Sequence, residues 1–186
     1  MQTYLKSFNI LTPTEIDEFV ASAVPRALKK GEFFITENSI CKEVAFIKSG
    51  ILRSYYTSAN AEEYTYCLTF PNQFMSAYSS LITGNPTVEN IQAMSDVDLL
   101  IIKKDVIDGL AESSINGLKL LKTIAEQQYL HLEKRVFMYQ KDAAKARYLE
   151  LFKNYPNYIK QIPIKYLASF LAITPRHLSR LRREII

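Results

Sequence analysis

Arginine and serine side chains near the C-terminus are spaced so that one helix face could present them to DNA. Ser179 and Arg180 each lie three or four residues from Arg176 and from Arg183, the spacing of one helix face. Guanidinium groups on such a face can pair with guanine edges or with phosphates. We interpret 175–185 as a recognition helix. The expected DNA contacts are Thr174, Arg176, His177, Ser179, Arg180, Arg183 and Lys165.

The apolar residues of 162–185 are spaced as two steeply crossing helices require. Leucine-sized and small residues alternate along Leu167, Ala168, Leu171, Ala172, Ile173, Leu178 and Leu181. Thr174 can cap the second helix and Pro175 suits its first turn. The segment therefore predicts a helix-turn-helix. A solvated basic helix ending a small bundle is the alternative, and it would not explain the crossing pattern or the cap.

The charge is distributed unevenly along the 186 residues. Residues 141–186 hold ten Lys/Arg and three Asp/Glu, whereas 1–140 hold thirteen and sixteen. The C-terminal part is therefore the candidate polyanion-binding part.

The rest of the chain divides into a helix and a run of strands. Thr12, Pro13 and Glu15 start a helix that we expect to end near Pro25. From Leu28 to about Lys103, short segments rich in Tyr, Phe, Ile and Val alternate with turn residues, which predicts an antiparallel β-roll or jelly roll.

Individual strands can be placed within that run. Segments 43–48 and 51–56 are expected to pair as a hairpin about Ser49-Gly50. In 64–70 the larger residues alternate with Thr65, Cys67 and Thr69, which predicts a strand with one buried face. Further strands are expected at 89–93 and 98–102. With the helices that surround it, this gives an α+β fold.

Beyond Ser113 the pattern becomes helical for about seven turns. A coiled-coil seam is formed by Leu118, Leu121, Ala125, Tyr129, Leu132, Val136 and Tyr139. Leu120, Ile124 and Phe137 lie off the seam and are expected to pack on the β domain. The seam predicts a homodimer, the alternative being one helix lying across its own domain. Asp142 is expected to cap the next helix, which ends at 154–157.

Several functional classes lack support in the sequence. Two widely spaced cysteines, Cys41 and Cys67, form neither a metal nor a redox pair, and we expect both in the core. No phosphate loop, metal-ligand spacing or nucleophile motif points to an enzyme, so we predict no catalytic residue, metal or cofactor. Without a signal peptide or long apolar run, a cytoplasmic location is expected.

Taken together, the chain resembles the CRP/FNR superfamily of transcription regulators. Residues 28–56 look like the opening strands of that family's β-roll, with Gly50 between strands, and the helix-turn-helix is the most specific match. The resemblance implies a cyclic-nucleotide-binding-like sensor domain (1–112), a long dimerisation helix (113–141) and a DNA-binding domain (142–186). It implies double-stranded DNA, a second copy of the chain and RNA polymerase as partners. Arg180 falls where the family commonly has a base-reading arginine.

The segment matching the family's nucleotide pocket, 74–93, departs from the cyclic-AMP-binding pattern. Ser76 and Ala77 stand where those members have a glycine and a glutamate, and Thr87 and Val88 stand where they have an arginine and a serine or threonine. We therefore expect no binding of cyclic AMP in the usual way.

The effector itself is not identified by the sequence. Further candidate pocket walls are Arg53, Tyr64, Tyr66 and Tyr78. We expect an unidentified small-molecule effector. The alternative function is an effector-independent or protein-binding sensor in which the helix-turn-helix does not read DNA. An iron–sulfur cluster needs more cysteines than are present, and His131 and His177 are poorly placed for haem.

Overall fold

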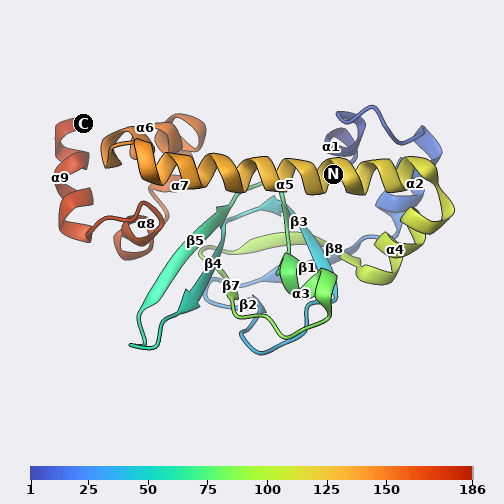
Figure 1. Cartoon of the computed structure of the whole chain (residues 1–186), viewed down its shortest axis with the longest axis horizontal. Helices are drawn as coiled ribbons and strands as arrows, with labels where there is room; N and C mark the ends of the chain where they lie inside the picture. The colour runs from blue at the N-terminus through green and yellow to red at the C-terminus, as the bar shows by residue number, and fades with distance from the viewer. Residues whose placement is uncertain (186) are drawn as a thin grey trace.

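The chain folds as a two-sheet β-roll lying under one long helix, with smaller helices at both ends (Figure 1). The computed structural model describes residues 1–185. At one end lie α1 (Gln2–Lys6), α2 (Pro13–Ala21) and α4 (Lys104–Ser113). The long helix α5 (Ile115–Lys141) crosses to the other end, where the C-terminal helices gather: α6 (Ala144–Asn154), α7 (Pro156–Ile159), α8 (Ile164–Phe170) and α9 (Pro175–Ile185).

The roll consists of two four-stranded antiparallel sheets. One sheet has the order β1 (Val24–Leu28), β8 (Val97–Lys103), β3 (Glu43–Ser49) and β6 (Phe74–Met75). The other has the order β2 (Phe33–Ile35), β7 (Asn90–Ala93), β4 (Leu52–Thr57) and β5 (Glu63–Thr69). A short helix, α3 (Tyr78–Thr83), lies between β6 and β7. The predicted α+β class with an antiparallel roll is confirmed.

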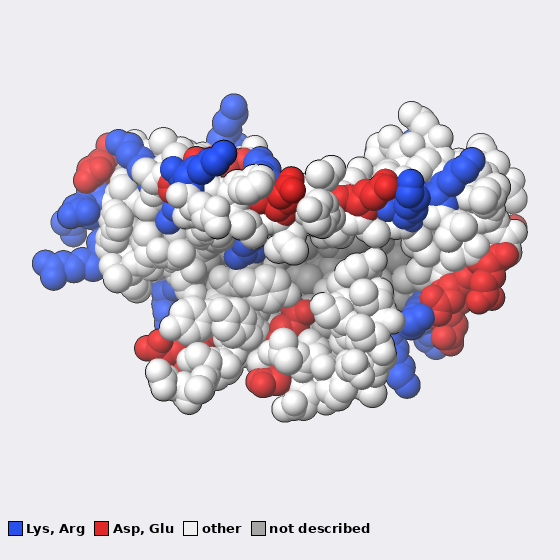
Figure 2. Space-filling view, viewed as in Figure 1, with Lys and Arg blue, Asp and Glu red and all other residues white. Residues whose placement is uncertain are grey.

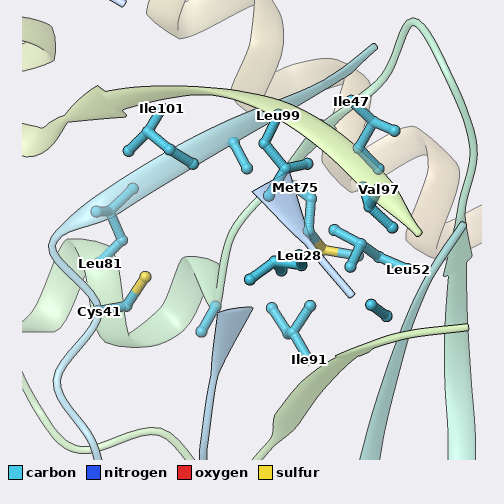
Figure 3. Close-up of a cluster of buried hydrophobic side chains, with 13 residues drawn as sticks. Leu28, Cys41, Ile47, Leu52, Met75, Leu81, Ile91, Val97, Leu99 and Ile101 are labelled. Carbon is cyan, nitrogen blue, oxygen red and sulfur yellow. The ribbon is translucent and has the colours of Figure 1, made fainter. Parts of the chain in front are cut away.

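Aliphatic side chains from both sheets meet in the interior of the roll (Figure 3). Ile47 and Leu99 come from the first sheet, and Leu52 and Ile91 from the second. All four are less than 2% exposed. Because alternate residues of a strand point to opposite faces, the other face of each sheet is left for helices to cover.

The predicted hairpin about Gly50 is wrong, because β3 and β4 lie in different sheets. β3 pairs with β8 and β6, whereas β4 pairs with β5 and β7. Gly50 has φ +87°, and a Cβ there would lie 2.3 Å from the carbonyl oxygen of Asp96. The glycine therefore turns the chain from one sheet to the other at a point of close backbone contact.

A β-bulge alters the predicted buried face of β5. Ser54 is opposite Cys67 and Tyr55 is opposite Thr65, so no residue of β4 lies opposite Tyr66. An extra residue reverses the faces of the residues beyond it. Thr65 is therefore buried while Tyr66 is 36% exposed.

The predicted helix starts and ends before and after the roll agree with the structure in one case and differ from it in two. Thr12 and Glu15 form the predicted capping box of α2. Pro25 lies not at a helix end but in the edge strand β1, where a missing N–H is tolerated. Asp142 does not cap α6, whose N-cap is Ala143, and instead ends α5.

Candidate nucleic-acid interface and sensor site

The two C-terminal helices α8 and α9 pack as a helix-turn-helix. Leu167 of α8, Leu171 at the C-cap of that helix and Leu178 of α9 are at most 1% exposed and share one apolar cluster. The His177 N–H donates to the Thr174 hydroxyl at 3.2 Å, as expected of an N-cap. Ala172 does not lie at the crossing. It is exposed in the turn with φ 53°, in the left-handed region.

The outer face of α9 carries the cationic side chains. A hollow of about 540 Å³ is lined by Thr174, Arg176, His177, Ser179, Arg180 and Arg183. These are six of the seven predicted DNA contacts, and Lys165 is exposed on α8. Figure 2 shows Lys and Arg gathered at the end of the molecule where α9 lies. The geometry therefore presents a continuous cationic helix face to solvent.

The long helix α5 has an apolar face that its own chain leaves exposed. Leu118, Tyr129, Leu132 and Val136 of the predicted seam are 45% to 64% exposed. Leu121 is half-buried and Ala125 exposed. Tyr139 points elsewhere, because its hydroxyl donates to the Phe170 carbonyl in α8.

The three residues expected off the seam do not behave alike. Leu120 is 1% exposed in a cluster with residues of α1, α2 and β8, and Ile124 packs against the same cluster. Phe137 is 47% exposed and does not pack on the roll, and Lys141 lies over its ring.

The predicted sensor residues lie in several different places. Arg53 is fully buried under α8, away from the interior of the roll. Tyr64 stacks on Tyr56 at the surface of the β4–β5 hairpin. The Ser76 hydroxyl donates to the Glu43 carbonyl. Ala77 and Thr87 are buried, whereas Tyr78 and Val88 are 43% and 75% exposed.

Tyr66 has a buried acid as its partner, and sequence reasoning missed that acid. The Tyr66 hydroxyl donates to the carboxylate of Glu89, which is 9% exposed. Burial raises the pKa of Glu89, while the bond from Tyr66 opposes that shift. Burial, followed by the nearby Glu89 charge, raises the pKa of Tyr66. A buried carboxylate therefore lies next to Thr87 and Val88, the positions that the resemblance matches to the cation of cyclic-AMP binders.

Arg135 of α5 is a second residue that sequence reasoning missed. Its guanidinium carbon lies 5.8, 5.3 and 5.1 Å from the ring centroids of Tyr66, Tyr139 and Phe170. These rings belong to the roll, α5 and α8. No carboxylate of residues 1–185 forms an ion pair with it. Only its three-dimensional neighbours distinguish this arginine from a solvated one.

Two general features of residues 1–185 bear on the class of site. No helix there has the length and apolar character needed to cross a membrane. No group of three or more His, Cys, Asp or Glu side chains is placed to hold a metal ion within that range.

Comparison with known proteins agrees with this architecture. Residues 25–114 match the family model of the cyclic nucleotide-binding domain. FixK2 from Bradyrhizobium japonicum superposes with a TM-score of 0.76 at 15% identity, covering 88% of this chain and 84% of that one. A CRP/FNR-family transcriptional regulator from Eubacterium rectale gives 0.71 at 20% identity, covering 98% and 87%.

A third solved structure extends the comparison. The catabolite activator protein of Thermus thermophilus gives a TM-score of 0.54 at 19% identity, covering 96% of this chain and 85% of that one. No curated protein matches the sequence significantly. The predicted resemblance to the CRP/FNR superfamily is confirmed at the level of fold.

Proposed function

We propose that this chain, which has the fold of CRP/FNR-superfamily transcription regulators, is a dimeric, sequence-specific DNA-binding regulator. The observation that carries the proposal is the outer face of α9. Six residues predicted from sequence to contact DNA line one hollow there, with three arginines among them. The proposed division is a sensor domain (1–112), a dimerisation helix (113–141) and a DNA-binding domain (142–186), of which Ile186 lies outside the described residues.

The test of DNA binding is selection of bound duplexes from random sequence, followed by titration of the selected site at several salt concentrations. We expect a steep fall in affinity with salt, because arginines that neutralise phosphates release counterions. The triple variant Arg176→Ala, Arg180→Ala, Arg183→Ala should lose binding while keeping its circular dichroism spectrum. If wild-type protein enriches no sequence, the alternative of a protein-binding sensor module is favoured.

The apolar seam of α5 supports a homodimer through that helix. Side chains as exposed as Tyr129 and Leu132 are stabilised when a second copy covers them. A two-fold dimer would place the recognition helices about 34 Å apart, so the selected site should be an inverted repeat. This spacing links the dimer to the DNA site.

The dimer is tested by sedimentation of Leu132→Glu, which introduces a charge into the seam. We expect this variant to be monomeric at concentrations where the wild type is dimeric. Leu130→Glu is the matched control, because Leu130 is 56% exposed on another side of α5. A monomeric wild type, with and without DNA, would refute the dimer.

The sensor domain is proposed to respond to a small molecule other than cyclic AMP. The acid Glu89 is buried beside Thr87 and Val88, and a phosphate there would face a carboxylate rather than a guanidinium. A buried charge without an opposite partner is strongly disfavoured. Calorimetric titration with cyclic AMP should show no binding in the micromolar range, and micromolar or tighter binding would contradict the proposal.

A further inference from the structure

The helix-turn-helix is packed onto the outer face of its own roll. Leu68 of β5 shares one buried cluster with residues of α6, α7, α8 and α9, and so do three residues that flank strands of the roll: Ile51 before β4, Phe70 after β5 and Met94 after β7. The Phe70 ring stacks on Tyr155 at 3.9 Å. The two modules therefore share a hydrophobic core, so the position of α8 on β5 fixes the position of α9.

One fully buried charged side chain lies inside this contact. Arg53 of β4 is 0% exposed, and the Nη2 atom donates to Glu63 at 2.6 Å. Its Nε and Nη1 atoms have no hydrogen-bond acceptor among residues 1–185. Taking a guanidinium out of water is costly, so another interaction must compensate.

Two tyrosine rings hold the Arg53 guanidinium between them. Its Cζ lies 3.8 Å from the ring centroid of Tyr55, on the same strand, and 3.7 Å from that of Tyr166, on α8. Arginine is suited to this slot because its guanidinium is planar and stacks on aromatic faces, whereas the ammonium of lysine does not. The sandwich is complete only when α8 lies at this place on the sheet.

A hydrogen bond next to the sandwich fixes the same register. β5 is the edge strand of its sheet, so its outward backbone groups lack a strand partner. The Thr65 N–H donates to the Ser169 hydroxyl of α8 at 2.9 Å, and that hydroxyl donates to the Glu63 carbonyl at 3.5 Å. Apolar packing is not directional, but stacking and hydrogen bonds are, so these contacts set the orientation of α8.

We propose that Arg53 is a positioning residue for DNA reading. Through Tyr166 it locks α8 on β5, and so holds the two recognition helices of a dimer at one separation. This inference rests on the proposed function. If the helix-turn-helix is held in one position on the roll, the dimer should bind only inverted repeats of one half-site spacing. If it can move on the roll, the dimer should tolerate several spacings.

The test measures affinity for the selected repeat with zero, one or two base pairs added between the half-sites. For the wild type we expect each added pair to weaken binding by about tenfold or more, since it shifts and rotates one half-site. Tyr166→Ala and Arg53→Ala should flatten this dependence to about threefold or less per pair. Tyr166→Phe keeps the ring and should keep the wild-type dependence.

A second measurement is independent of DNA. Hydrogen exchange at the Thr65 amide should be at least about tenfold faster in Tyr166→Ala than in wild type, because the amide loses Ser169 when α8 moves away. Leu120→Ala is the control for loss of stability alone, since Leu120 packs at the other end of the molecule. It should lower the melting temperature without changing the spacing dependence.

The outcomes separate the two proposals. A sharp spacing dependence and a protected Thr65 amide in Tyr166→Ala would overturn the role of Arg53. A wild type that binds no DNA would overturn the proposed function and with it the role in DNA reading, while the exchange measurement would still show whether the sandwich locks α8. If Leu120→Ala also lost the dependence of affinity on half-site spacing, lowered stability would explain the effect. That result would also overturn the role of Arg53.

Discussion

Arg180 offers the sharpest test of whether α9 reads DNA as proposed. Its side chain is 70% exposed and lines the hollow on the outer face of α9. Its nearest carboxylate, that of Glu184, is 3.9 Å away, and an exposed helical pair at that distance contributes at most about 0.5 kcal/mol. Arg180→Ala should therefore leave the melting temperature within about 2 °C of wild type.

The effect on DNA should be large and confined to one base pair of each half-site. A bidentate arginine–guanine contact contributes about 1–3 kcal/mol of discrimination, which is about 5- to 150-fold. The assay is fluorescence anisotropy with duplexes in which each base pair of the half-site is changed in turn. In Arg180→Ala the penalty at one position should disappear, while the penalties at the other positions persist.

The control is Lys153→Ala, which removes one positive charge from an exposed position of α6 outside the hollow. It should leave every base-pair penalty as in wild type. If Arg180→Ala instead weakens binding equally for all sequences and reduces the salt slope by about one, Arg180 contacts a phosphate. The reasoning that makes it a base-reading residue would then be refuted.

Three further predictions concern stability. Ala172→Gly should raise the free energy of unfolding by about 0.5–1 kcal/mol, because φ 53° strains alanine but not glycine; an unchanged or lower denaturant midpoint would count against that strain. Gly50→Ala should lower the free energy of unfolding by about 2–5 kcal/mol, from strain at φ +87° and overlap with the Asp96 carbonyl, and a wild-type melting curve would be inconsistent with the tight corner. Hydrogen bonds, first that from Ser114, lower the pKa of Glu15 from 4.5 to about 2, so its stabilisation is present above pH 4.5 and is lost as the pH falls toward 2. In Glu15→Gln the free energy of unfolding should fall less between pH 5 and pH 2 than it does in wild type. An equal fall in the two proteins would contradict the lowered pKa of Glu15.

Sequence reasoning succeeded where the determining signals are local. The capping box of Thr12 and Glu15 and the N-cap at Thr174 each involve residues three positions apart. Helices depend on such short-range contacts, so the start of α2 and the start of α9 were predicted correctly. The outer face of α9 follows from the same local repeat, which is why its residues line one hollow.

It failed where partners distant in sequence decide the structure. A glycine between two strands is compatible with a hairpin and with a corner between sheets, and at Gly50 the pairing of β3 with β8 decides between them. The extra residue at Tyr66 follows from the register between β4 and β5, which no local pattern records. Arg53 was expected at a pocket wall, whereas α8, more than 100 residues later, covers it.

Two buried ionisable side chains contact β5, Glu89 through Tyr66 and Arg53 through Glu63. Glu89 accepts a hydrogen bond from Tyr66, whose ring faces Arg135 of α5, whereas Arg53 lies against Tyr166 of α8. Tyr66 is the bulged residue between Thr65 and Cys67. A ligand that displaced Tyr66 from Glu89 would therefore move the segment of β5 in which the Thr65 N–H donates to the Ser169 hydroxyl. Rigid packed elements pass on such shifts as discrete rearrangements rather than gradual deformation. Replacing Glu89 by Gln should therefore change DNA affinity through the position of α8, and the Thr65 amide would report that change without any DNA present.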